Sequence, residues 1–141
     1  MNDSFILIAE DDADDRLLLE TAFAEIGYDG KLQFVSNGEE LSEYLRATKD
    51  EPSTPGVIIL DLNMPRKNGR EILKEIRSNK QYQKIHIAIF STTKNEAEVQ
   101  ECFDLGADNY FVKPINYNAL LQFVKDIYEV WNAVSAKYPS N

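Results

Sequence analysis

Short apolar runs alternate with segments of helical periodicity along the whole chain. The apolar runs occupy residues 5–9, 32–35, 57–60, 85–90 and 109–112. Each run has the length and composition of a strand. The run at 57–60 reads Val-Ile-Ile-Leu, and four consecutive apolar residues are typical of a strand buried on both faces of a parallel sheet. We therefore expect residues 57–60 to form a central strand.

The segments between these runs carry apolar residues at i, i+3 and i+4 spacing, which predicts helices with one buried face. The predicted helices cover residues 13–26, begin after Gly38 and at about Gly69, pass through residues 97–105, and cover residues 116–136. Leu18, Leu19, Ala22, Phe23 and Ile26 give the first helix its apolar positions. Residues 47–56 contain two prolines and are expected to form a surface loop.

Strict alternation of strand and helix predicts right-handed crossovers and a parallel sheet with helices on both faces. The expected fold is one doubly wound α/β domain over residues 1–141. Its five-stranded sheet would have the flavodoxin-like strand order 2-1-3-4-5.

Four of the five predicted strands end at a residue that can do chemistry. Glu10 and Asp11 follow the first strand, Asp61 the third, Ser91 the fourth and Lys113 the fifth. The carboxyl ends of parallel strands lie on one edge, and the first and third strands are neighbours in this order. These side chains should therefore lie close together.

Clustered carboxylates repel one another by about 4 kcal/mol per pair at about 4 Å and an effective dielectric near 20. Either their pKa values rise or a cation binds, and oxygen ligands of this kind suit Mg²⁺ or Mn²⁺. A carboxylate, a hydroxyl and an ammonium around such an ion form a typical phosphoryl-transfer site. Asp61 is the candidate acceptor because it follows the most buried strand. A lone Asp61 before Pro65 would instead suggest a turn cap.

Four segments combine these residues with characteristic neighbours. They are Glu10-Asp11, Asp61-Leu62-Asn63-Met64-Pro65 with Gly69 four residues on, Ser91, and Tyr110-Phe111-Val112-Lys113-Pro114. Together they resemble a response-regulator receiver domain of the two-component family, over nearly the whole chain.

The resemblance implies a role for each matching residue. Asp61 would be the phosphorylation site. Asp11 and Asp61 would bind Mg²⁺, or Mn²⁺, through their carboxylates, Asn63 through its main-chain carbonyl, and Glu10 through water.

The remaining matching residues would act on the phosphoryl group and the switch. Ser91 would bind the phosphoryl group, Lys113 would pair with it, and the Lys113–Pro114 bond would be cis. Tyr110 would change rotamer together with Ser91. The hydroxyl is retained at position 91, where many members have Thr, so function should survive.

The resemblance also implies a phosphorylation-activated signalling switch rather than an enzyme acting on other molecules. A sensor histidine kinase would supply the phosphoryl group, and output would occur by contact with a downstream protein. Residues 61–73 and 91–98 resemble single-domain regulators paired with phytochrome-type histidine kinases.

Composition narrows the choice of partners and compartment. Acidic residues outnumber basic ones by 24 to 15, for a net charge of −9, which argues against binding nucleic acid or an anionic membrane surface. No apolar run approaches the roughly 20 residues of a transmembrane helix. Cys102 is the only cysteine, so no internal disulfide is expected, and a cytoplasmic protein is predicted.

Three other functions remain open. A phosphohydrolase with an aspartyl intermediate would usually carry a second acid where this chain has Asn63. A flavodoxin-like nucleotide or flavin binder would need a glycine-rich loop after the first strand, where Glu10, Asp11 and Asp12 would repel phosphate. A degenerate receiver could act as a constitutive adaptor, but the intact set of site residues argues against it.

The last predicted helix, residues 116–136, has more apolar residues than one buried face requires. Tyr117, Phe123 and Val130 fall outside the stripe formed by the others. Either the buried face is wide, or the last strand and its flanking helices form a homodimer or partner surface.

Overall fold

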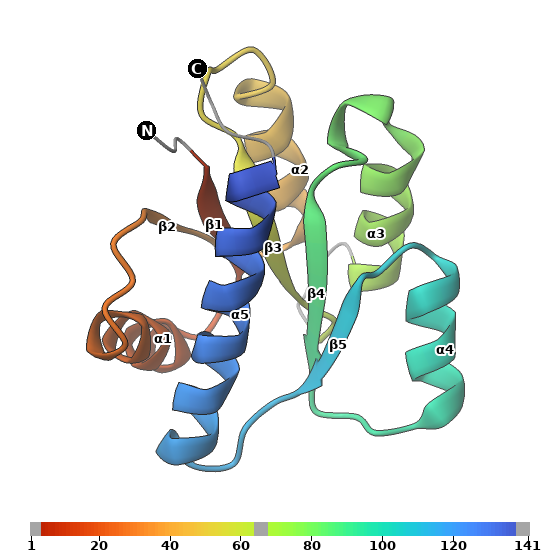
Figure 1. Ribbon diagram of the computed structural model, residues 1–141. Coiled ribbons are helices and arrows are strands. Elements are labelled where there is room, and N and C mark those ends of the chain that lie inside the picture. The colour runs from red at the N-terminus through yellow and green to blue at the C-terminus, as the bar shows by residue number, and fades with distance from the viewer. Residues whose placement is uncertain (1–3, 64–67, 138–141) are drawn as a thin grey trace.

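The computed structural model describes residues 4–63 and 68–137, which fold into alternating strands and helices. The elements are β1 (Phe5–Ala9), α1 (Ala13–Glu25), β2 (Leu32–Val35), α2 (Gly38–Ala47), β3 (Pro55–Asp61), α3 (Gly69–Ser78), a 3₁₀ turn (Lys80–Tyr82), β4 (His86–Ser91), α4 (Glu96–Asp104), β5 (Asn109–Val112) and α5 (Tyr117–Lys137). The order of elements is the predicted one (Figure 1).

The five strands form one parallel sheet in the order β2-β1-β3-β4-β5. This confirms the predicted doubly wound, flavodoxin-like topology. Ala9 of β1 pairs with Leu60 of β3, so the residues that follow these two strands emerge side by side. The chain adds β2 on one side of β1 and then adds β3, β4 and β5 on the other side. Open α/β sheets bind their ligands where this change occurs, here between β1 and β3.

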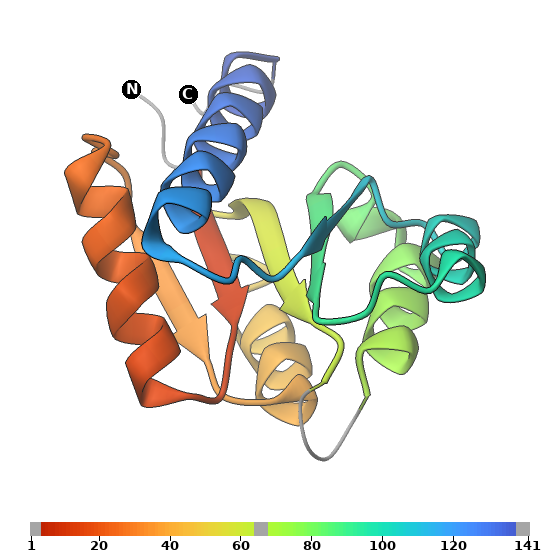
Figure 2. The ribbon, with the colours of Figure 1, turned by 90° about the horizontal axis from the view of Figure 1, so that it is seen from below.

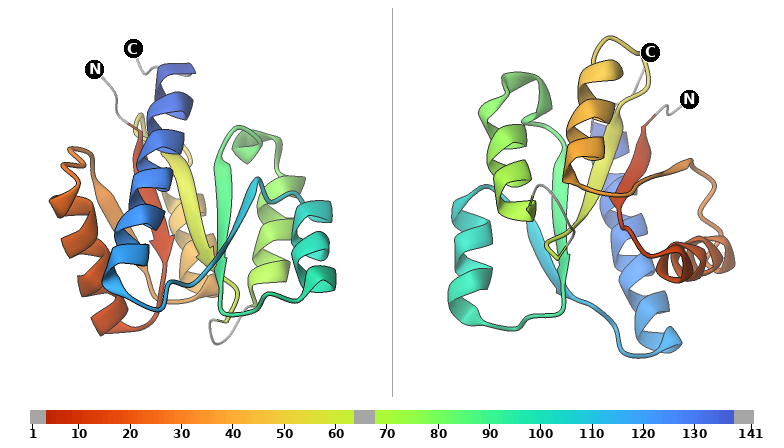
Figure 3. Two further views of the ribbon diagram at one scale, coloured as in Figure 1. Left: turned by 60° about the horizontal axis from the view of Figure 1, so that its bottom comes forward. Right: turned by 180° about the vertical axis from the view of Figure 1, so that it is seen from behind.

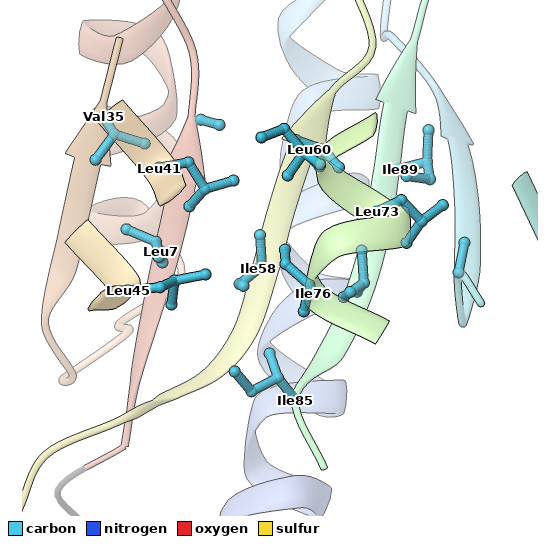
Figure 4. Packing of buried hydrophobic residues seen from close by; sticks show 14 of the residues in the cluster. Leu7, Val35, Leu41, Leu45, Ile58, Leu60, Leu73, Ile76, Ile85 and Ile89 are labelled. Atoms are coloured by element: carbon cyan, nitrogen blue, oxygen red, sulfur yellow. The ribbon is translucent and has the colours of Figure 1, made fainter. Parts of the chain in front are cut away.

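Helices cover both faces of the sheet, and each face has its own apolar core. Helices α1 and α5 lie on one face, and α2, α3 and α4 on the other (Figures 1 and 3). Alternate residues of each strand serve the two cores: Ile58 and Leu60 of β3 face α2 and α3, and Val57 and Ile59 face α1 and α5. Figure 4 shows the first core, where Leu41, Leu73 and other helical side chains pack on the strands.

Strand β3 begins earlier than the sequence suggested, at Pro55 inside the predicted loop. Proline is accepted as the first residue of a strand, because its missing N–H is not needed there. Pro55 pairs with Phe5 of β1, next to a register shift. The loop predicted over residues 47–56 is therefore shorter than expected, because Pro55 and Gly56 belong to β3.

The surplus apolar residues of α5 are partly accounted for within the chain. Phe123 is buried and stacks on Phe90 with ring centroids 4.6 Å apart. Its ring also meets Phe111 of β5 edge to face, at 5.0 Å. In contrast, Leu18 was predicted to face the core but is 46% exposed on α1. The buried face is thus wider on α5 and narrower on α1 than the periodicity indicated.

Within residues 4–63 and 68–137, no helix has both the length and the apolar character that crossing a bilayer requires.

Candidate functional site

The carboxyl ends of β1, β3, β4 and β5 bring together the residues that the sequence analysis selected. Figure 2 looks onto this edge of the sheet. Glu10, Asp61 and Ser91 are buried there, and the ammonium of Lys113, which follows β5, lies close to both acids. Asp11 is exposed. The site is therefore open to solvent on the side of Asp11 and closed by the sheet on the other.

Both carboxylate oxygens of Asp61 are held by hydrogen bonds. The main-chain N–H of Asn63 donates to Oδ1 at 2.8 Å, and the Lys113 ammonium donates to Oδ2 at 2.7 Å. The first bond comes from the turn that directly follows β3, and the second comes from the end of β5. Together they fix the orientation of a carboxylate that is 2% exposed.

Carboxylate oxygens of Glu10, Asp11 and Asp61 lie within 4.8 Å of one another. Glu10 Oε2 accepts the main-chain N–H of Asp12 at 3.1 Å. Its buried Oε1 has no hydrogen-bond partner among residues 4–63 and 68–137, and it lies 3.8 Å from Lys113 Nζ. A buried carboxylate oxygen without a hydrogen bond is costly. The acidic cluster therefore fits a divalent cation, which would give this oxygen a partner directly or through a bound water.

Burial raises the pKa of Glu10 to about 7, and the main-chain hydrogen bond from Asp12 and the charge of Lys113 only partly offset it. For Lys113 the balance goes the other way. Burial lowers its pKa, but the hydrogen bond to Asp61 and the charges of Asp61 and Glu10 outweigh this effect, so that the pKa is raised. Lys113 thus stays an ammonium ion at neutral pH, while Glu10 takes up a proton at a higher pH than an exposed glutamate does.

Ser91 and Tyr110 are connected through Thr93. The Thr93 N–H donates to Ser91 Oγ at 3.3 Å, and the Tyr110 hydroxyl donates to the Thr93 carbonyl at 2.9 Å. In the same loop, Thr92 Oγ1 accepts a hydrogen bond from the Asn63 side chain at 3.3 Å. The loop after β4 therefore contacts both the turn after Asp61 and the aromatic residue of β5.

The turn after Asp61 depends on a close approach between Leu62 and the first residue of α3. A Cβ at Gly69 would lie 2.6 Å from Leu62 Cδ2 and 3.0 Å from Leu62 Cα. Asn68 caps α3 by accepting the Glu71 N–H at 3.0 Å. Met64, Pro65 and the Arg66-Lys67 pair lie outside the described residues.

Two findings were not expected from the sequence. The Lys113–Pro114 bond, predicted to be cis, is trans, the form with the lower intrinsic energy. In addition, Arg16 of α1 donates to the Glu10 carbonyl at 2.7 Å. Arg16 follows a run of acids, but no other feature of the sequence marks it. Its acceptor is a main-chain carbonyl, which no residue type in the sequence identifies.

Comparisons with known proteins agree with this geometry. The model of the response regulator receiver domain family matches residues 6–125. Response regulator Rcp1 of Synechocystis sp. is 30% identical over 128 residues, which cover 89% of this chain and 87% of Rcp1. A chemotaxis protein CheY homolog of Campylobacter jejuni is 30% identical over 122 residues, covering 86% of this chain and 90% of the homolog.

Solved structures give the same result. The phosphorylated cyanobacterial phytochrome response regulator RcpA superimposes with a TM-score of 0.82 at 35% identity, covering 92% of this chain and 94% of RcpA. The Mn²⁺-bound form of Rcp1 superimposes with a TM-score of 0.79 at 31% identity, covering 91% and 94%. On its sequence, its fold and the arrangement of its acidic edge, the chain belongs to the response regulator receiver domain family.

Proposed function

We propose that this chain is a phosphorylation-activated switch of a two-component system, in which Asp61 receives a phosphoryl group from a histidine kinase. The observation that carries the proposal is the setting of the Asp61 carboxylate. It ends the central strand, is fixed by Asn63 and Lys113, and lies beside a buried carboxylate oxygen of Glu10 that accepts no hydrogen bond from the part of the chain that the structure describes. Membership of the receiver family supports the same function.

In this proposal Asp11 and Asp61 bind Mg²⁺ or Mn²⁺ through their carboxylates, Asn63 through its main-chain carbonyl and Glu10 through water. The separation of the acidic oxygens supports this assignment, as does the similarity to Rcp1, whose structure was determined with Mn²⁺. When bound, the cation would neutralise the acids and the negative charge on the phosphoryl oxygens.

The chain's own residues account for the transfer step. A carboxylate oxygen of Asp61 attacks phosphorus as the P–N bond of a phosphohistidine breaks, and the imidazole leaves with the electrons of that bond. The ammonium of Lys113, now hydrogen-bonded to Asp61, pairs with a phosphoryl oxygen. The chain would catalyse only its own phosphorylation and dephosphorylation. Asn63 offers no second acid for rapid turnover.

The switch would run through the loop after β4. A phosphoryl group on Asp61 adds acceptor oxygens and negative charge near the Ser91 hydroxyl. If Ser91 turns to donate to it, the contact between Ser91 Oγ and the Thr93 N–H changes. Because Thr93 also holds the Tyr110 hydroxyl, the loop and Tyr110 would rearrange together. The face formed by α4 and β5 would then present a different surface to a downstream protein.

A phosphodonor protein would approach along α1 and the segment after β5. Leu17 is 61% exposed and Ile115 is 95% exposed. Between these segments lies a cavity of ≈ 210 Å³ that Leu18, Lys113 and Ile115 help to line. Lys113 belongs both to this pocket and to the acceptor site, where it donates to Asp61. Exposed apolar side chains around such a pocket are typical of a protein contact. The similarity to RcpA, a phytochrome response regulator, supports a phytochrome-type kinase as the donor.

We also propose that the chain forms a homodimer through β5 and the helices α4 and α5 that flank it. Strand β5 is an edge of the sheet, and Val112 on it and Phe103 on α4 remain exposed. Phe123 no longer supports a dimer, because it is buried within the chain. Light scattering at micromolar concentration, with and without a phosphoryl analogue, tests this. A monomeric mass in both conditions would remove the dimer from the proposal.

Phosphotransfer from a purified, radiolabelled histidine kinase tests the central function. We expect label to pass to the wild-type chain in the presence of Mg²⁺ and not to Asp61→Asn. Label that appears as free phosphate without a phosphorylated chain would favour a hydrolase. Tight Mg²⁺ binding without any transfer, from phytochrome-type or chemotaxis-type kinases, would favour the adaptor.

A further inference from the structure

Arg16 holds the turn that carries the acidic pair. Its Nε donates to the main-chain carbonyl of Glu10 at 2.7 Å. Its second guanidinium nitrogen donates to Ser36 Oγ, also at 2.7 Å. The guanidinium carbon lies 5.5 Å from the centre of the Phe34 ring. A residue of α1 thus connects the end of β1 to the end of β2.

Hydrogen bonds hold Glu10 at its main-chain N–H, at its side chain and at its carbonyl. The Glu10 N–H donates to the Val35 carbonyl at 3.0 Å, and Glu10 Oε2 accepts the Asp12 N–H at 3.1 Å. The carbonyl is fixed by Arg16. The peptide between Glu10 and Asp11 is therefore held at its Glu10 carbonyl, and this peptide sets the direction in which both acidic side chains leave the backbone.

We propose that Arg16 is a positioning residue for the divalent cation site. It does not touch the cation. It fixes the Glu10–Asp11 peptide so that both carboxylates face Asp61, within the 4.8 Å cluster. Both acceptors of Arg16, a carbonyl and a hydroxyl, are uncharged, so the effect depends on the geometry of the forked guanidinium more than on its charge. The inference rests on the proposed function, which places the cation at this cluster.

Calorimetric titration of the purified chain with Mg²⁺, without any phosphodonor, tests the inference. We expect Arg16→Met to weaken Mg²⁺ binding about 10- to 100-fold, the usual effect of removing a group that orients a metal ligand. Arg16→Lys keeps the charge but cannot bridge Glu10 and Ser36 in the same way, so it should also bind several-fold more weakly than wild type. Ser36→Ala removes one anchor and should show a smaller loss in the same direction.

Arg46→Met is the matched control, because it makes the same change in charge at an exposed position on α2. It should bind Mg²⁺ as the wild type does. Circular dichroism shows whether each variant is folded. If Arg16→Met does not fold, Ser36→Ala still tests the inference.

Two results would overturn the inference while leaving the proposed function intact. One is unchanged Mg²⁺ affinity in folded Arg16→Met and in Ser36→Ala. The other is full wild-type affinity in Arg16→Lys, which would show that charge alone is sufficient. A wild-type chain that binds no Mg²⁺ would overturn the proposed function together with this inference. That result differs from the two above, in which the wild type binds Mg²⁺.

Discussion

At Glu10, folding and the proposed cation binding favour different protonation states of the same carboxyl group. Its carboxyl is buried at the end of β1, and burial raises its pKa from 4.5 to about 7. The folded chain therefore holds a proton on Glu10 over a pH range in which the unfolded chain has released it. The acid would be needed in its charged form for a cation, and the fold alone disfavours that form.

This shift predicts a pH dependence in the absence of divalent cations. A carboxyl with a raised folded pKa contributes stability that is fully present below pH 4.5 and is lost as the pH rises through about 7. Glu10→Gln removes this loss. Urea unfolding in EDTA should therefore show Glu10→Gln gaining stability relative to wild type between pH 5.5 and pH 8. A constant difference over that range would contradict the assignment.

Lys113 is the residue that compensates the acids when no cation is present. Its ammonium lies 2.7 Å from Asp61 Oδ2 and 3.8 Å from Glu10 Oε1. Lys113→Met should lower the free energy of unfolding by roughly 2–3 kcal/mol in EDTA at pH 7, because it leaves the buried Asp61 carboxylate without its ammonium partner. Saturating Mg²⁺ should recover part of this loss.

Urea unfolding of Lys113→Met with and without Mg²⁺ measures both effects. Lys125→Met, at an exposed position on α5, is the control and should change the stability by less than about 0.5 kcal/mol. Equal stability of Lys113→Met and wild type in EDTA would show that the ammonium does not offset the acids.

Among the helices, α3 meets the site through its first residue, Gly69, which packs against Leu62 in the turn after Asp61. Gly69→Ala would place a methyl group 3.0 Å from Leu62 Cα. We expect a loss of about 1–3 kcal/mol in unfolding free energy, as for other overpacked positions, together with slower phosphorylation. Thermal and urea unfolding measure the first effect and phosphoryl incorporation the second.

Lys74→Ala, at an exposed position on the same helix, controls for the change in helix composition. It should leave phosphorylation unchanged. A Gly69→Ala chain that is as stable and as readily phosphorylated as wild type would mean that the turn adjusts without cost.

Two arginines of α3 connect this helix to its neighbours in different ways. Arg77, with a side chain 17% exposed, donates to the carbonyls of Gly106 and Ile85, each at 2.8 Å, and to Asp108. Arg70, 37% exposed, makes ion pairs with Glu98 and Glu101 of α4. The acceptors of Arg77 are mainly main-chain carbonyls, whereas those of Arg70 are carboxylates that are partly exposed to solvent.

Arg77→Ala should therefore cost roughly 2–3 kcal/mol of unfolding free energy, and Arg70→Ala less than about 1 kcal/mol. The Arg70 effect should shrink further as salt is added, because exposed ion pairs are screened. Urea unfolding at low and high ionic strength compares the two variants directly. A larger loss for Arg70→Ala would contradict this order.

At the scale of the whole molecule, the fold and the gathering of the acids could both be predicted from the sequence. Alternating strands and helices require a parallel sheet, and a parallel sheet gathers its strand ends at one edge. Asp61, Ser91 and Lys113 could be identified because each directly follows an apolar run. Periodicity is a local property of the chain, and the alternation of strands and helices can be read along it, so the sequence carries both.

Other features could not be predicted, because they depend on three-dimensional packing. The sequence does not show that Glu10 is buried while its neighbour Asp11 is exposed. It also does not show that Arg16 and Arg77 bind main-chain carbonyls, because a carbonyl occurs at every residue and only the fold selects one. The trans Lys113–Pro114 bond also differs from what the family resemblance implied.

Asp61 should accept a phosphoryl group in a reaction that this chain catalyses by itself, given a divalent cation and a phosphodonor. Incubation with acetyl phosphate and Mg²⁺, followed by intact mass measurement, tests it most directly in wild type and Asp61→Asn. We predict a labile gain of one phosphoryl group in the wild type, absent without Mg²⁺ and absent in Asp61→Asn. An equal gain in Asp61→Asn, or no gain in a wild-type chain that binds Mg²⁺, would contradict the account.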